Sequence, residues 1–425
     1  MTSSQRNELK RSLGISQGVA MAVGAVVGVS ILALPAMTAR EAGPAALLSW
    51  LGMALLSIPI VLCIAELAAR QPTAGGVLDY VSSAFGERAS TALGIAFLGT
   101  IPIGMPVISI IGARYAVHAA GLPIAWATWL AFGAAAIAVF LNALGVKLAG
   151  RIQVVVVVLV VALVVVCTSA AIPLVDRHYL VPFSPAGNTA IVAATVPIFF
   201  SFVGWEMVAP MAEEFRNPAR DLRRSLLIAV AIVGVMYLAF AFVTISTGVY
   251  RYGDGIDSFS ALAEKSLGKY GLYATTFLAC LVAYASLHIN VAGFSRMLYS
   301  QAREGRLPTY FAKVSVSSGA PVPALALTLV MFTFVFTLIG IYHPDLGFLV
   351  KWPATVFIFA YLFTTAAGFQ LLRENKMGRA LSAIGFALCA IAFVSSGWLM
   401  LFPLGLFAAG YFVSRRSGSV AQAIE

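Results

Sequence analysis

Glu206 is the residue with the clearest chemical potential in this sequence, because it lies near the middle of an apolar stretch. The same stretch has prolines at positions 197 and 210 and contains the run Ser201-Phe202-Val203-Gly204-Trp205. An ionisable side chain at the centre of a membrane span costs about 2.5–3.5 kcal/mol on insertion scales, so a functional role is the default expectation. Such a carboxyl could carry a proton, staying neutral when desolvated and ionising when water reaches it. The alternative is a protonated carboxyl that hydrogen-bonds an interrupted backbone and never titrates.

His288 is the other titratable candidate inside an apolar stretch, within the run Ser286-Leu287-His288-Ile289-Asn290. It could line a pathway, or it could make a hydrogen bond between two helices. The sequence contains no H-E-x-x-H, G-x-S-x-G or P-loop motif. The four cysteines, all in apolar runs, have no metal-ligand spacing; they are Cys63, Cys167, Cys280 and Cys389. We therefore expect no metal and no cofactor.

Two apolar stretches are rich in residues that weaken helices. One contains Pro35 after the run Gly24-Ala25-Val26-Val27-Gly28-Val29-Ser30, and the other surrounds Glu206. A glycine costs about 1 kcal/mol and a proline about 3 kcal/mol inside a helix. In lipid, freed backbone groups are tolerated only where protein or a cavity satisfies them. At such breaks, amides can hold a carboxylate and carbonyls an ammonium, which fits a zwitterionic amino acid. Close packing of helices at Gly24 and Gly28 is the structural alternative.

The elements that position these residues are predicted to be membrane helices. Of the 425 residues, 60% are hydrophobic and 10% are charged, whereas soluble domains carry about 25% charged residues. Continuous apolar runs long enough to span a bilayer recur along the chain, which favours helices over a β-barrel. The predicted fold class is an all-α integral membrane protein. Its twelve predicted spans are residues 14–39, 45–67, 89–119, 122–144, 150–173, 191–211, 225–250, 270–296, 322–342, 346–372, 380–396 and 399–413.

The net charge of +10 is explained by membrane orientation rather than by nucleic acid binding. With the N-terminus in the cytoplasm, 20 lysines and arginines fall inside and 5 fall outside, while Arg114 and Lys351 lie in spans near the outer side. This bias predicts that both termini are cytoplasmic. Fusing the last two spans into one would place Arg415 and Arg416 outside, so two separate spans are predicted.

The two interrupted stretches belong to predicted spans 1 and 6. A separation of five spans is the spacing of two five-span inverted repeats with discontinuous first helices. The predicted organisation is a cytoplasmic N-terminus (1–13), a first repeat (14–173), a second repeat (191–372), two appended spans (380–413) and a cytoplasmic tail (414–425).

Five segments carry a resemblance to a known family over about residues 14–413. In chain order they are GAVVGVSILALP, PTAGGVLDY, LNALGVKLAGRIQ, FSFVGWE with the following EEFRNPARDLRRS, and SRMLYSQAREGRLP. The chain resembles the amino acid–polyamine–organocation (APC) superfamily, and within it the bacterial branch that exports methionine and branched-chain amino acids. The resemblance implies a five-plus-five inverted repeat with broken helices 1 and 6 and two appended spans.

The resemblance also implies a substrate site at the two breaks. The substrate carboxylate would meet the backbone of Gly28, Val29 and Ser30. The amino group would meet the carbonyls of Val26, Phe200 and Val203, beside the Gly204 break. Phe200 matches an aromatic gate. The side-chain pocket would draw on Met105 and Ile108, with Phe202 and Trp205 as weaker candidates.

The chain departs from the family pattern at two places. Gly28-Val29-Ser30 stands where many members have Gly-Ser-Gly or Gly-Thr-Gly. Val160 stands where many members carry a lysine in span 5 that replaces a sodium ion. Proton coupling through that lysine is therefore not expected in this chain. Glu206, with His288 nearby, is the predicted proton-coupling group.

Together with these features, the resemblance implies a secondary active transporter in the cytoplasmic (inner) membrane of a bacterium. Its predicted partners are a small neutral L-amino acid with an aliphatic or thioether side chain, protons as the coupling ion, and the lipid bilayer. We expect efflux by alternating access, with proton-coupled import or exchange as the alternative. A membrane-embedded enzyme would need facing catalytic groups, and nothing in the sequence pairs Glu206 with His288. A channel would show repeated rings of polar residues, and none is visible.

Overall fold

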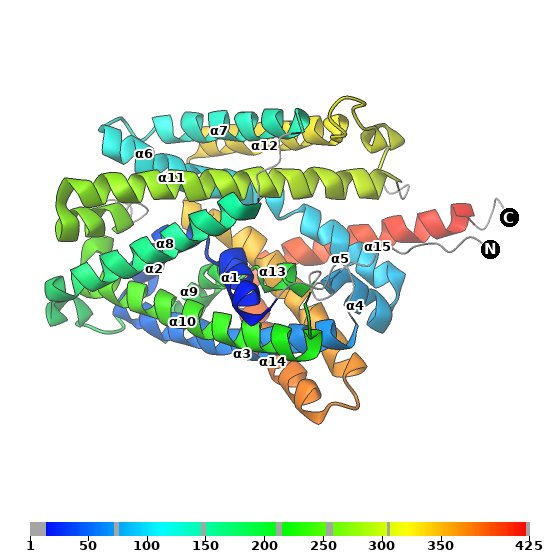
Figure 1. Ribbon diagram of the computed structural model, residues 1–425, viewed down its shortest axis with the longest axis horizontal. Coiled ribbons are helices and arrows are strands. Elements are labelled where there is room, and N and C mark those ends of the chain that lie inside the picture. The colour runs from blue at the N-terminus through cyan, green and yellow to red at the C-terminus, as the bar shows by residue number, and fades with distance from the viewer. Residues whose placement is uncertain are drawn as a thin grey trace.

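The structure is a computed structural model that describes residues 14–71, 76–145, 150–209, 215–251, 258–303 and 307–421. The described residues are almost entirely helical, and no strand element occurs among them. Most long helices run along the long axis of the molecule (Figure 1). The predicted N-terminal segment 1–13 and Pro210 of the second break lie outside the described residues.

Within the described residues, eight α-helices precede position 175. They are α1 (Ile15–Val26), α2 (Ser30–Ala42), α3 (Ala46–Arg70), α4 (Val77–Phe85), α5 (Glu87–Leu98), α6 (Ile101–Ala120), α7 (Trp126–Ala143) and α8 (Gly150–Ala171). Seven more α-helices follow in the described residues beyond position 175. They are α9 (Asn188–Ser201), α10 (Arg223–Ser246), α11 (Ser258–Arg303), α12 (Val322–Tyr342), α13 (Leu346–Leu371), α14 (Lys376–Ser395) and α15 (Leu401–Ala421).

Helical stretches of membrane-spanning length and apolarity are confirmed, although the number twelve stays a prediction. Eight stretches in the described chain are long and apolar enough to cross a bilayer. Four shorter apolar helices cover Ile15–Val26, Val158–Leu174, Asn188–Ser201 and Gly397–Phe412. The predicted span 322–342 coincides with α12, and 346–372 coincides with α13 to within one residue.

Several boundaries differ from the sequence-based prediction, and three of them change how a span is built. The span predicted at 89–119 is divided into α5 and α6 by a turn at Gly99 and Thr100, where Pro102 starts the new helix because it needs no amide partner there. The helix of the predicted span 191–211 ends early, at Ser201. At the C-terminal end, α15 continues to Ala421, inside the segment predicted as a tail. The short helix α4 was not predicted.

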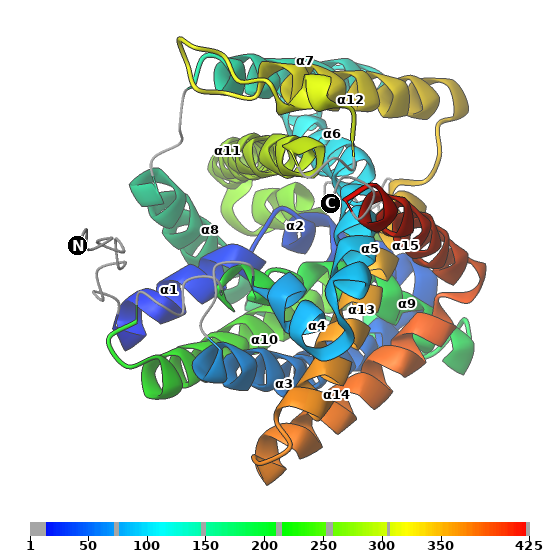
Figure 2. The same cartoon turned by 90° about the vertical axis from the view of Figure 1, so that its right-hand side faces the viewer.

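The interrupted helices lie in the middle of the molecule. In the view of Figure 2, α7 and α12 form one edge, with α6 and α11 beneath them. Helices α3, α10 and α14 form the opposite side, and α1, α9 and α13 lie between the two groups. Helix α1 packs against α10, and α9 packs against α2, α3 and α13. The two breaks are therefore enclosed by unbroken helices.

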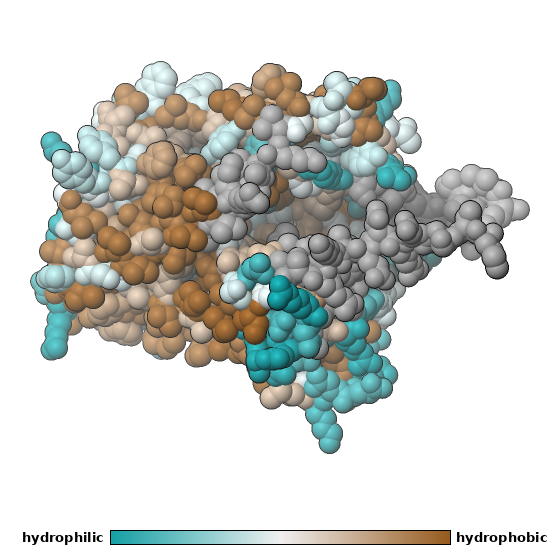
Figure 3. All heavy atoms as spheres, viewed as in Figure 1, coloured by the Kyte–Doolittle hydropathy of each residue, from teal (hydrophilic) through white to brown (hydrophobic). Residues whose placement is uncertain are grey.

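The outer surface of the bundle is apolar. Large side chains that are more than three-fifths exposed include Trp129 of α7, Val235 of α10, Phe277 of α11 and Phe334 of α12. Hydrophobic residues cover much of the visible side, and hydrophilic residues gather near the start of α10 and the connection from α13 to α14 (Figure 3). Soluble monomers rarely expose apolar surface on this scale, so the surface is suited to lipid.

Candidate functional site

The first break separates α1 from α2. Helix α1 ends at Val26, Val27 has extended dihedrals (φ −73°, ψ 103°), and α2 begins at Ser30. A Cβ built on Gly28 would meet no atom within 4 Å, so space is open beside the break. The first amides of a helix have no partner within the helix and carry partial positive charge. The start of α2 is therefore suited to a carboxylate.

The second break follows α9, and it touches the first. Gly204 has φ +126°, a conformation that side chains rarely adopt, and the chain resumes as a 3₁₀ turn from Trp205 to Met207. A Cβ on Gly204 would collide with the Ala25 carbonyl oxygen and would lie 3.2 Å from the Val26 nitrogen. The two interrupted segments thus meet backbone to backbone, at a place where only glycine fits.

Glu206 ties the second break to α13. Its side chain is buried, with 7% of the residue exposed. The Gly204 amide donates to Oε2 at 3.0 Å, and the Tyr361 hydroxyl of α13 donates to the same oxygen. The other oxygen, Oε1, is buried and has no hydrogen-bond partner among the described residues. The carboxyl therefore has one oxygen held by two donors and one oxygen free to take a proton.

Tyr237 of α10 contacts the first break. Its hydroxyl donates to the Val26 carbonyl at 3.1 Å. Its ring packs edge-on against Phe202 (centroids 5.2 Å apart) and Trp50 (5.7 Å). The Val26 carbonyl, predicted to meet the substrate amino group, already accepts this hydrogen bond. Phe202, a weaker pocket candidate, is buried in this aromatic cluster.

Phe200 lies at the end of α9 between α6 and α13. Its ring centroid is 6.4 Å from that of Phe357, and a Cβ on Gly104 would lie 3.9 Å from its Cζ. It is partly buried, whereas its neighbour Phe199 is 1% exposed. Phe200 therefore lies beside the turn of α6 that contains Met105, as a residue covering a bound molecule there would need to.

The remaining predicted site residues are mostly buried near the breaks. Met105 and Ile108 are 5% and 7% exposed on α6, and Val29 and Ser30 are buried at the start of α2. Val203 is half-buried. Trp205 is buried, and its indole nitrogen has no hydrogen-bond partner in the described part of the chain. This polar atom at the second break is available to a ligand or to water.

His288 lies at the contact between α7 and α11. The Asn142 side-chain nitrogen is 3.3 Å from His288 Nδ1 and donates to the His288 carbonyl at 3.2 Å. These contacts match the alternative of a hydrogen bond between helices. A coupling role for His288 stays a prediction. Across the described residues, no group of three or more His, Cys, Asp or Glu side chains could hold a metal ion.

Tyr361, Tyr237 and Trp50 were missed by sequence reasoning. Each lies in an unbroken apolar helix with no unusual neighbours in sequence. The available signal was chemical, because a buried tyrosine or tryptophan in an apolar span usually places its polar atom on a partner. Tyr361 and Tyr237 do so at the two breaks, and the Trp50 indole donates to Thr38 Oγ1 at 3.1 Å.

The known proteins that this chain is similar to include amino acid permeases and an amino acid exporter. A sequence model described as amino acid permease matches residues 13–417. The uncharacterized amino acid permease YecA of Bacillus subtilis (strain 168) is 39% identical over 97% of this chain and 97% of its own. The L-methionine/branched-chain amino acid exporter YjeH of Escherichia coli (strain K12) is 30% identical over 94% of this chain and 95% of its own. The branched-chain amino acid permease BcaP of Bacillus subtilis is 25% identical over 75% of this chain and 72% of its own.

The family match covers almost the whole chain, including both breaks and Glu206. Two relatives that are at least 30% identical also align over nearly their full lengths. The chain therefore belongs to the amino acid permease family of the APC superfamily, a family of amino acid transporters and not of enzymes.

Proposed function

We propose that this protein carries neutral amino acids with aliphatic or thioether side chains across the cytoplasmic membrane of a bacterium. The observation that carries the proposal is the backbone contact between Gly204 and Ala25, with open space beside Gly28. This contact brings the end of α1 against the segment that follows α9, and α2 begins shortly after it at Ser30. The amides would hold the substrate carboxylate, and carbonyls such as those of Phe200 and Val203 would hold the ammonium.

The apolar lining supports a neutral substrate. Met105, Ile108 and Phe200 would line the position of the substrate side chain, and they offer no charge to pair with one. A mostly apolar pocket with a few polar groups selects by shape and by the absence of uncompensated charge. The similarity to YjeH, an exporter of methionine and branched-chain amino acids, supports the same class.

Transport would follow alternating access around the breaks in two inverted five-span repeats, with twelve spans and both termini in the cytoplasm. Glu206 would couple the cycle to protons through its unpartnered oxygen Oε1. Val160, which is 3% exposed on α8, supplies no charge that could replace it. The direction we propose is efflux.

Import or exchange is the second candidate, because the same site can be used in either direction. Its support is the 25% identity to the branched-chain amino acid permease BcaP. The substrate class would be unchanged, and only the direction of net flux would differ.

The test is flux in proteoliposomes that contain the purified protein, with a panel of labelled amino acids and with or without an imposed pH gradient. We expect methionine, leucine, isoleucine and valine to be carried and to compete with one another. Better competition by arginine or glutamate than by methionine and leucine would contradict the substrate class. Counterflow in inverted membrane vesicles then separates efflux from import.

A further inference from the structure

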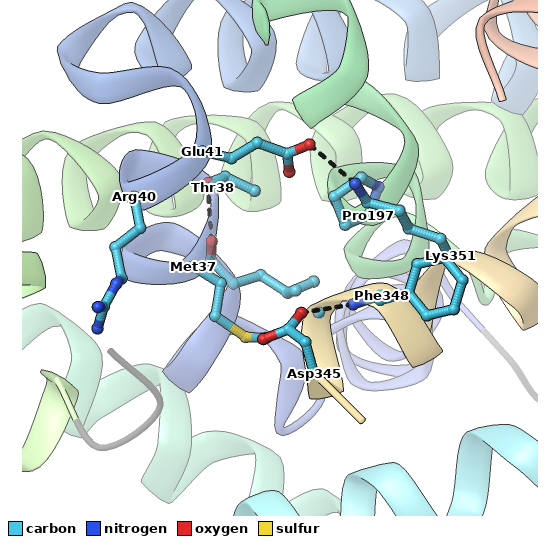
Figure 4. Close-up of a pocket in the computed structure, with 10 residues that line it drawn as sticks. Met37, Thr38, Arg40, Glu41, Pro197, Asp345, Phe348 and Lys351 are labelled. Atoms are coloured by element: carbon cyan, nitrogen blue, oxygen red, sulfur yellow. Dashed lines mark hydrogen bonds and ion pairs between the residues drawn. The ribbon is translucent and has the colours of Figure 1, made fainter. Parts of the chain in front are cut away.

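A pocket of about 420 Å³ lies at the end of α2 remote from the breaks (Figure 4). Its walls come from the last turns of α2, from Pro197 of α9, and from the start of α13. The charge distribution in the sequence predicts that this end faces the outside of the cell. The volume falls within the range of about 300–1,000 Å³ that is usual for small-molecule sites.

The pocket is separate from the breaks but is built on the same helices. Ser30 begins α2 at the first break, and Glu41 lies eleven residues later in the same helix. At 1.5 Å per residue, these two positions are about 16 Å apart. Leu34, which is completely buried one turn beyond Ser30, also lines the pocket on the side of the first break. A molecule held by the charged side chains at the far end of α2 would therefore be distinct from one bound at the first break.

Four charged side chains line the pocket, and their charges sum to zero. Lys351 Nζ of α13 is 2.8 Å from Glu41 Oε1 of α2, and these side chains are 20% and 33% exposed. Asp345 accepts the Phe348 amide at 2.8 Å and so caps α13. Arg40 lies on the other side of the pocket from Lys351 (Figure 4). Both signs of charge are thus presented to one cavity.

The other lining residues are apolar or, like Thr38, already make hydrogen bonds within the protein. Met37, Pro197 and Phe348 offer apolar surface next to the charges. The Thr38 hydroxyl donates to the Leu34 carbonyl at 2.7 Å and accepts from the Trp50 indole at 3.1 Å. Recognition of a ligand therefore falls to the charged groups, with apolar surface for a side chain.

We propose that this pocket is a second binding site for a zwitterionic amino acid, on the route between the breaks and the outer medium. The carboxylate pairs with Lys351, the ammonium pairs with Glu41 and Asp345, and the ligand enters the existing ion pair between α2 and α13. A ligand with only one of the two charges leaves one sign of pocket charge without a partner. The inference rests on the proposed function, from which it takes the substrate class.

The first experiment is equilibrium binding of labelled L-methionine to the full-length protein in lipid nanodiscs. We expect two equivalents per protein. Lys351→Gln is expected to weaken one of them by about tenfold or more, because it removes a charge-assisted contact. The matched control is Lys269→Gln, which removes the same charge from an exposed position on α11 that does not line the pocket. The control should keep both equivalents unchanged.

A second variant guards against misfolding of the first. Asp345→Asn removes the negative charge but keeps a residue type that caps helices well. It should also weaken one equivalent only. Two probes then test the zwitterion requirement in the wild-type protein. L-methionine methyl ester lacks the carboxylate and N-acetyl-L-methionine lacks the ammonium, and neither should displace the equivalent that Lys351→Gln weakens.

The outcomes separate this inference from the proposed function. One equivalent that neither Lys351→Gln nor Asp345→Asn alters would overturn the second site and leave the site at the breaks standing. If the wild-type protein binds one equivalent and both variants lose it, the single site lies in the pocket. That result would overturn both the site at the breaks and the proposal that the pocket is a second site. No saturable binding of any neutral amino acid would overturn both.

Discussion

The Tyr361 hydroxyl and the Gly204 amide donate to the same oxygen of Glu206, so that a single carboxyl joins the second break to α13. Oε1 is left buried without a partner among the described residues. A protonated carboxyl, or the amide of a glutamine, could make the same contacts, because only Oε2 accepts hydrogen bonds. The protonation state of Glu206 is therefore positioned to affect both α9 and α13.

The first prediction concerns coupling. Glu206→Gln keeps the accepting oxygen for Tyr361 and Gly204 but cannot release a proton. We expect binding of amino acids to be preserved, exchange of labelled for unlabelled substrate to continue, and flux driven by a pH gradient to be lost. The measurement is gradient-driven flux beside exchange in the same proteoliposomes. Gradient-driven flux at the wild-type rate in the Gln variant would refute the coupling role, and His288 would then be tested.

The second prediction concerns the contact between the breaks. Gly204→Ala forces a side chain into a backbone conformation at φ +126°, which costs on the order of 1–3 kcal/mol, and drives its Cβ into the Ala25 carbonyl. We expect a marked loss of thermal stability in detergent. Gly28→Ala is the control, because its Cβ would meet no atom within 4 Å. It should fold normally and bind substrate more weakly, since its methyl group enters the open space.

The third prediction separates gating from packing at two adjacent phenylalanines. Phe200→Ala should weaken substrate retention more than it lowers the melting temperature, because Phe200 is only partly buried. Phe199→Ala should do the opposite, because Phe199 is 1% exposed and its ring centroid is 5.6 Å from that of Tyr361. Removing such a buried ring costs about 3–5 kcal/mol. Strong destabilisation by Phe200→Ala with unchanged affinity would favour a packing role.

The fourth prediction compares two ion pairs near the start of α10 and the connection from α13 to α14. Glu66 is 3.3 Å from Arg223 Nη1 and accepts the Asn375 side-chain amide at 2.8 Å, with 17% of its side chain exposed. Glu66→Gln should therefore lower the free energy of unfolding by about 1 kcal/mol. Glu374 pairs with Arg70 at 3.4 Å but is 86% exposed. Glu374→Gln should change stability by less than about 0.5 kcal/mol. Equal melting shifts in the two variants would contradict this ranking.

Much of the helical framework could be predicted from the sequence, because long apolar runs have few alternatives in a bilayer. The run that became α12 has no glycine or proline signal inside it strong enough to interrupt it, and its bounds match the prediction. The two breaks were also predictable in position, since helix-weakening residues gather at Gly24–Ser30 and Ser201–Glu206. The turn at Gly99 and Thr100 was not, because a lone glycine is common in unbroken spans.

The contacts that complete the site could not be predicted in this way. Tyr361 and Glu206 are 155 residues apart, Tyr237 and Val26 are 211 apart, and Lys351 and Glu41 are 310 apart. Periodicity within one helix says which face is apolar but not which helix it meets. Lys351 was placed near the outer side from charge counting alone, and its partner on α2 became visible only in three dimensions.

The backbone contact at Gly204 limits how the protein can change over generations. The atoms that a new side chain would strike belong to the main chain of residues 25 and 26, so no replacement of the Ala25 side chain can make room. A steric conflict is usually relieved by a smaller neighbouring side chain. No such substitution can relieve this one, because the clashing atoms belong to the backbone. In a genetic selection for restored growth from a Gly204 mutant, revertants at codon 204 should outnumber suppressors elsewhere.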